Sequence, residues 1–115
     1  MHVAVRKKGD VVIVDMTGRL VGGIGDEILR NVVNELLAEE WKKILLNLSG
    51  ITAIDSAGIG ELVASLKTAR HLGAGLRILN LNERVRTALH LGRLLPLFEV
   101  YQDEKAAVES FGAAA

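Results

Sequence analysis

The sequence Ile44-Leu45-Leu46-Asn47-Leu48 is followed a few residues later by Asp55-Ser56-Ala57-Gly58-Ile59-Gly60. The first segment is almost continuously apolar, which predicts a central strand over residues 43–48 that is buried on both faces. Apolar residues then recur at helical spacing, which predicts a helix over residues 56–72. A serine therefore stands where a parallel strand meets a helix. The unpaired N–H groups and partial positive charge of a helix N-terminus can hold a phosphate there, and the hydroxyl could itself be phosphorylated.

The flanking segments predict further strands and helices. A turn at Lys7-Lys8-Gly9-Asp10 separates two β-branched runs, which indicates an N-terminal antiparallel hairpin. An amphipathic helix is predicted from Ile24 to Glu39, and Asn82 and Asp103 are the predicted N-caps of two later helices. The predicted strands are residues 3–6, 11–17, 43–48, 76–81 and 98–101, and the third helix is predicted to extend to Leu94, before Pro96.

This order of elements predicts an α/β sandwich. Its sheet is mixed and mostly parallel, with the N-terminal antiparallel hairpin and about four helices. We expect a single domain over residues 1–111 and a short disordered tail over residues 112–115. Functional sites in such sheets gather at the carboxyl ends of the strands. Residues 50–60 leave that end of the central strand, so position and chemistry point to the same loop.

The composition excludes several classes of function. The 115 residues carry a formal net charge of zero, which does not favour nucleic acid as a partner. There is no cysteine, so disulfides and thiolate chemistry are excluded, and no cofactor or metal site is predicted. The chain also shows no signal peptide and no apolar run of membrane-spanning length. We therefore expect a cytoplasmic protein without direct membrane insertion, and self-association remains open.

Over almost its whole length the chain resembles the STAS domain, named for sulfate transporters and anti-sigma factor antagonists. The resemblance rests on the order of the elements and on two segments, Ile54-Asp55-Ser56-Ala57-Gly58-Ile59-Gly60 and Leu76-Arg77-Ile78-Leu79-Asn80. It is nearest to the free-standing bacterial antagonists. The family often has an acidic residue after the Gly-x-Leu that ends the second strand, but here Gly18-Arg19-Leu20 is followed by Val21.

The resemblance implies a protein that is not an enzyme and works by partner switching. Ser56 matches the serine that an anti-sigma factor with serine kinase activity phosphorylates and a serine phosphatase dephosphorylates. Phosphorylation would place new negative charge beside Asp55, so the partner would be released. The predicted partner-binding residues are Asp55, Ser56, Ala57, Gly58, Ile59 and Gly60, together with the neighbouring glycines Gly22, Gly23 and Gly25.

Other interpretations of the same fold remain open. One is a scaffold or adaptor in a signalling assembly or a membrane transport complex, in which Ser56 is never modified. Another is a degenerate receiver-like domain with Asp55 as its phosphoaspartate, although Met16 follows Asp15 where a second acid is expected and Leu95 replaces a lysine. A simpler role for Ser56, compatible with phosphorylation, is the N-cap of its helix.

Two catalytic or phosphate-binding motifs are matched only in part. Ile54 replaces the first glycine of a Gly-x-Ser-x-Gly nucleophile elbow, and His71 would lie about 20 Å from Ser56 at the rise of a helix. A hydrolase is therefore not expected. No Gly-Lys-Ser/Thr follows Gly22-Gly23-Ile24-Gly25, which indicates a flexible entry to a helix with Asp26 as its N-cap or first-turn acid.

Overall fold

The computed structural model describes residues 1–112 of the chain. Within them, five strands form one sheet in the order β1-β2-β3-β4-β5, accompanied by four α-helices and a short 3₁₀ helix. β1 pairs antiparallel with β2 and the later pairs are parallel, so the predicted mixed sheet with an N-terminal hairpin is confirmed. The elements are β1 (His2–Lys8), β2 (Val11–Leu20), α1 (Gly25–Ala38), β3 (Lys43–Ile54), α2 (Ser56–His71), β4 (Gly75–Leu79), α3 (Glu83–Leu91), η1 (Leu95–Leu97), β5 (Val100–Tyr101) and α4 (Glu104–Ser110). Of the predicted tail over residues 112–115, Gly112 is described and residues 113–115 lie outside the described residues.

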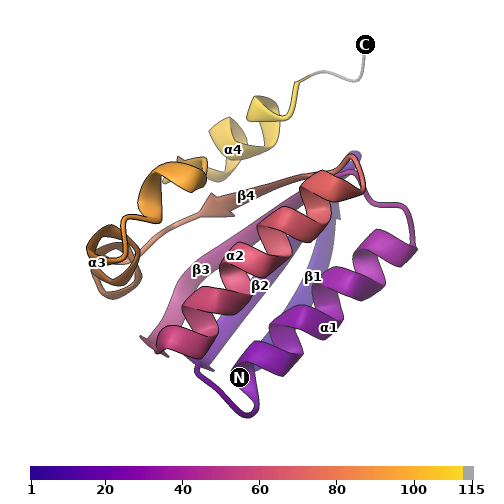
Figure 1. The fold of residues 1–115 in the computed structure, drawn as a ribbon. Coiled ribbons are helices and arrows are strands. Elements are labelled where there is room, and N and C mark those ends of the chain that lie inside the picture. Colours follow the sequence, from indigo (N-terminus) through magenta and orange to yellow (C-terminus); the bar gives the residue numbers. More distant parts are fainter. Residues whose placement is uncertain (113–115) are drawn as a thin grey trace.

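The two faces of the sheet are covered by different helices. α1 and α2 lie side by side over one face (Figure 1), where alternate residues of β2 and β3 join the larger core cluster. The intervening residues, including Ile13 and Leu45, point to the other face and pack with Ala107 of α4. α2 contributes Leu62 and Leu66, both almost fully buried, to the larger cluster. Burial on both faces explains the continuous apolar run in β3.

Ion pairs fasten α4 to the N-terminal hairpin. Glu104, in the first turn of α4, pairs with Arg6, and its other partner is Lys8, whose Nζ lies 2.9 Å from a carboxylate oxygen. These two cations lower the pKa of Glu104 to about 2. Arg6 also pairs with Asp15 at 2.7 Å, and Asp15 accepts a hydrogen bond from Asn47. A polar network therefore crosses three strands on the face of the sheet that carries α4.

Several predicted boundaries differ from the structure. β3 continues to Ile54 instead of ending at Leu48, because residues 50–54 pair with the end of β2 through a shifted register. α3 ends at Leu91, short of the predicted Leu94, where Gly92 caps it and Arg93 takes a left-handed conformation with φ 57°. β4 likewise ends at Leu79 because Asn80 has φ 58°. The predicted caps Asn82 and Asp103 are confirmed, and each accepts a backbone hydrogen bond.

The carboxyl end of β2 lies between the first turns of two helices. A β-carbon on Gly58 of α2 would lie 2.0 Å from the carbonyl oxygen of Leu20, and one on Gly25 of α1 would lie 2.3 Å from the carbonyl oxygen of Arg19. Both distances are far below van der Waals contact. The two glycines therefore let both helices approach the end of β2 more closely than any other residue would allow. Within residues 1–112, no helix is long and apolar enough to cross a membrane.

Two glycines of α2 provide a direct test of this close approach. We expect Gly58→Ala to destabilise the domain by roughly 1–3 kcal/mol, because the backbone at Leu20 must move to admit the methyl group. Gly60 has open space around its would-be β-carbon, so Gly60→Ala should stabilise the helix by roughly 0.5–1 kcal/mol. Urea unfolding of the two variants measures both effects. Equal changes in the two variants would contradict the packing argument.

Candidate functional site

The turn between β3 and α2 is organised by the carboxylate of Asp55. Asp55 is the N-cap of α2, and its side chain accepts a hydrogen bond of 2.9 Å from the backbone N–H of Gly58. Ser56 is the first residue of the helix, so the expectation that Ser56 is the N-cap is wrong. The cap is one residue earlier because Asp55 has the extended backbone that an N-cap needs. Ser56 itself is exposed.

The same carboxylate reaches a second segment of the chain. The backbone N–H of Gly22, in the loop between β2 and α1, donates to both oxygens of Asp55 at 3.2 and 3.0 Å. A β-carbon on Gly22 would lie 3.0 Å from the β-carbon of Ala57, so the two segments are in contact. These contacts join the Asp55–Gly60 segment to the glycine loop that the sequence analysis predicted as its neighbour. Nothing in their spacing along the chain predicted the hydrogen bond that joins them.

The loop between β2 and α1 is held by its own hydrogen bonds. The N–H of Gly23 donates to the side chain of Asp26 at 3.1 Å, and the N–H of Asp26 donates to the carbonyl of Val21 at 3.2 Å. Gly23 has φ 105°, a conformation that side chains rarely tolerate. Asp26 is a first-turn acid, since the N-cap of α1 is Ile24. The loop is therefore an ordered helix entry built on backbone contacts.

The predicted site residues divide into an exposed group and a buried group. Asp55, Ser56, Ala57 and Gly60 are exposed at the start of α2, as are Gly22 and Gly23 in the neighbouring loop. Gly58 and Gly25 are buried and act by letting the backbone pack, and Ile59 is half-buried against the core. Most residues of the exposed group are glycine, alanine or serine, which have small side chains or none. Such a surface admits the close approach of another protein.

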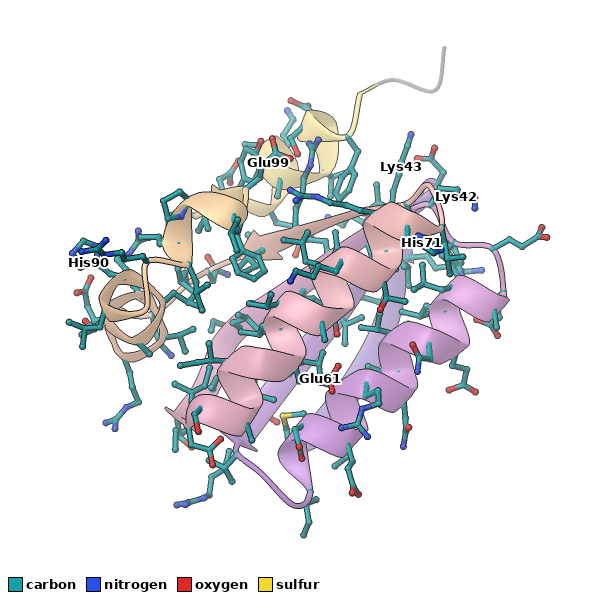
Figure 2. The ribbon with its side chains drawn as sticks, viewed as in Figure 1. Lys42, Lys43, Glu61, His71, His90 and Glu99 are labelled. Carbon is teal, nitrogen blue, oxygen red and sulfur yellow. The ribbon has the colours of Figure 1, made fainter. Side chains whose placement is uncertain are left out.

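The charges of the site are concentrated on Asp55. Hydrogen bonds from the backbone of Gly22, and then of Gly58, lower the pKa of Asp55 below its usual value, so the carboxylate is ionised near neutral pH. Glu61 is also in the first turns of α2, but it points toward α1 (Figure 2), where it pairs with Arg30 at 2.9 Å. The carboxylate that faces the Ser56 surface is therefore that of Asp55.

The structure gives no support to the hydrolase and receiver interpretations. His71 lies at the opposite end of α2 from Ser56, so it cannot serve as a base for the serine, and His90 is an exposed residue on α3 (Figure 2). A receiver domain has a parallel sheet in which the first strand lies between the second and third. Here β1 is an antiparallel edge strand and the order is sequential. Asp15 is bound to Arg6 and Asn47 in the network described above.

Comparison with known proteins gives a consistent family assignment. A family model described as the STAS domain matches residues 2–107 of the chain. A Thermotoga neapolitana protein named as a putative anti-sigma factor antagonist is 33% identical over 78 residues, which cover 68% of this chain and 69% of that protein. The crystal structure of a putative anti-sigma factor antagonist from Thermotoga maritima matches with a TM-score of 0.85 at 28% identity, over 94% of this chain and 92% of the other.

A third match is to the Bacillus cell fate determinant SpoIIAA in its phosphorylated form. Its TM-score is 0.74, over 96% of this chain and 99% of the other. The identity is 16%, so this likeness shows the fold alone.

The hydrogen bonds that Asp55 accepts from Gly22 and Gly58 should make the stability of the domain depend on pH. Because folding lowers the pKa of Asp55, its stabilising effect is complete above the unfolded value of about 3.9 and is lost as the pH falls through the lower folded value. Asp55→Asn keeps a capping oxygen but cannot ionise. We expect the wild type to unfold at a higher temperature than this variant at pH 7, and the difference to shrink below about pH 4. A difference that is constant with pH would contradict the assignment.

Proposed function

The chain belongs to the STAS domain family, and we propose that it acts as an anti-sigma factor antagonist that is switched by reversible phosphorylation of Ser56. The unphosphorylated protein binds an anti-sigma factor that is also a serine kinase, and so frees the sigma factor. Phosphorylation by that partner ends the binding, and a serine phosphatase restores it. The protein itself catalyses no reaction, and the exchange takes place in the cytoplasm.

One observation carries this proposal. The hydroxyl of Ser56 is exposed at the start of α2, at the carboxyl end of the sheet, and the carboxylate of Asp55 lies in the preceding residue. Since Asp55 provides the helix cap, α2 does not need the serine side chain to complete its N-terminus. The hydroxyl is therefore free to accept a phosphoryl group without loss of the contacts that hold the helix. This arrangement suits a residue that is modified and restored repeatedly.

The direction of the switch follows from the charges. A phosphoryl group adds roughly 1.5 to 2 negative charges near neutral pH. On Ser56 this charge would stand beside the ionised Asp55, among exposed residues with small side chains. A partner packed against that surface would face electrostatic repulsion and the cost of burying the phosphate. The N–H groups at the start of α2 favour a negative charge, so the domain itself remains folded.

Phosphoryl transfer is tested by intact mass spectrometry. The partner is the anti-sigma factor that co-purifies with the tagged chain from the organism that makes it. This partner is then purified on its own. After incubation with this partner and ATP, we expect the wild-type chain to gain one phosphate and Ser56→Ala to gain none. A partner that binds the wild type without ever modifying it would refute the phosphorylation switch. A scaffold or adaptor in a signalling or transport assembly would then be the better account.

The effect of the charge on binding is tested with two substitutions of Ser56. Ser56→Asp introduces a negative charge and should weaken binding to the same anti-sigma factor by about tenfold or more, since unfavourable charge pairs at an interface cost several kcal/mol. Ser56→Ala should bind as tightly as the wild type and stay bound in the presence of ATP. Titration calorimetry measures both affinities. Equal affinities of the two variants would contradict release by charge.

A further inference from the structure

Ile24 is a large apolar side chain exposed beside the candidate site. It lies in the loop between β2 and α1 and is 68% exposed. The other exposed large hydrophobic residues within residues 1–112 lie elsewhere: Val5 on β1, Leu72 after the far end of α2, and Leu91 and Leu97 near α3 and η1. Figure 1 shows the start of α1 and the start of α2 at the same end of the molecule. Ile24 is thus an exposed aliphatic group at the end that carries Ser56.

The position of Ile24 makes isoleucine a poor choice for the stability of the domain. Ile24 is the N-cap of α1 and its side chain makes no capping hydrogen bond. Serine, threonine, aspartate and asparagine are strongly preferred at N-caps, and isoleucine is among the least favourable residues. The side chain is also absent from the two core clusters of residues 1–112. Neither capping nor packing within the described domain explains this residue, and such conflicts tend to mark functional positions.

The loop also holds Ile24 in a fixed place relative to Ser56. Gly22 is hydrogen-bonded to Asp55 and touches Ala57, and Ile24 follows two residues later, within about 7 Å of chain length. Hydrogen bonds at Gly23 and Asp26 fix the loop on both sides of Ile24. An apolar group presented by a rigid loop loses little entropy on binding.

Building on the proposed function, we infer that Ile24 is an apolar anchor that enters a hydrophobic pocket of the anti-sigma factor and helps to select that partner. The exposed charges flanking Ile24 include Glu27, three residues further along α1, and Asp55, reached through Gly22. Arg19, near the end of β2, is also exposed, so the charges around Ile24 are of both signs. A pocket of matching chemistry is therefore apolar at its centre, with basic residues opposite Glu27 and Asp55. Isoleucine at this position makes the N-terminus of α1 less stable than a capping residue would, and its role is to bind the partner.

The test compares substitutions of Ile24 with a control at another exposed apolar residue, Leu91. Ile24→Ser removes the apolar group and supplies a good N-cap. Because the apolar group is lost, binding to the purified anti-sigma factor should weaken by about tenfold or more, as expected for an anchor residue of an interface. The melting temperature of Ile24→Ser should equal or exceed that of the wild type. Ile24→Val keeps a branched apolar side chain and should retain most of the affinity. Leu91→Ser, at a residue 77% exposed, should leave the affinity unchanged.

The outcomes separate this inference from the proposed function. If the wild type binds and Ile24→Ser binds equally well, the inference is wrong while the proposed function stands. Loss of binding in Ile24→Ser together with a lower melting temperature would also count against it, since the residue would then be structural. If the wild type binds no anti-sigma factor, the proposed function fails and the inference fails with it.

Discussion

The carboxylate of Asp55 joins two segments of the chain that are 33 residues apart in sequence, and the geometry of the site depends on it. Asp55 accepts one hydrogen bond from the N–H of Gly58, which caps α2. It also accepts from the N–H of Gly22, which holds the loop before α1. Both contacts need the helices to approach the end of β2 closely, which Gly25 and Gly58 permit. Removing the carboxylate of Asp55, or adding a side chain at Gly25 or Gly58, would separate the loop from α2. The exposed surface around Ser56 would then lose its shape.

Small residues serve two separate purposes in this region. Gly25 and Gly58 are buried and set the distance between helix and strand, whereas Ala57, Gly60 and Gly22 are exposed and set the relief of the surface. A sequence motif rich in glycine and alanine does not distinguish these roles. The distinction matters for interpretation, because substitutions in the first group would disturb the packing of helix on strand, whereas those in the second would also alter the exposed surface around Ser56. Under the proposed function, only the exposed group is available for direct contact with a partner.

Much of the fold was predictable because its signals are local. The hairpin, the buried run in β3 and the caps Asn82 and Asp103 follow from periodicity and turn chemistry. The extension of β3 to Ile54 was missed because it depends on an irregular pairing with β2. The shift of the cap from Ser56 to Asp55 was missed because both residue types are good caps, and backbone geometry decided between them. The link from Asp55 to Gly22 depends on tertiary structure and has no sequence signal.

The apolar packing that stabilises α2 lies away from Ser56. Its inner face contributes Leu62, Leu66 and Ala69 to the core, each at most 3% exposed, while Ser56 lies outside that contact. The network of Arg6, Asp15 and Glu104 that fastens α4 lies on the other face of the sheet. Charge added at Ser56 therefore leaves the core and this network intact. Under the proposed function, the negative charge of a phosphoryl group would act mainly at the exposed surface, where it would change which proteins bind. The domain would then be switched without being unfolded.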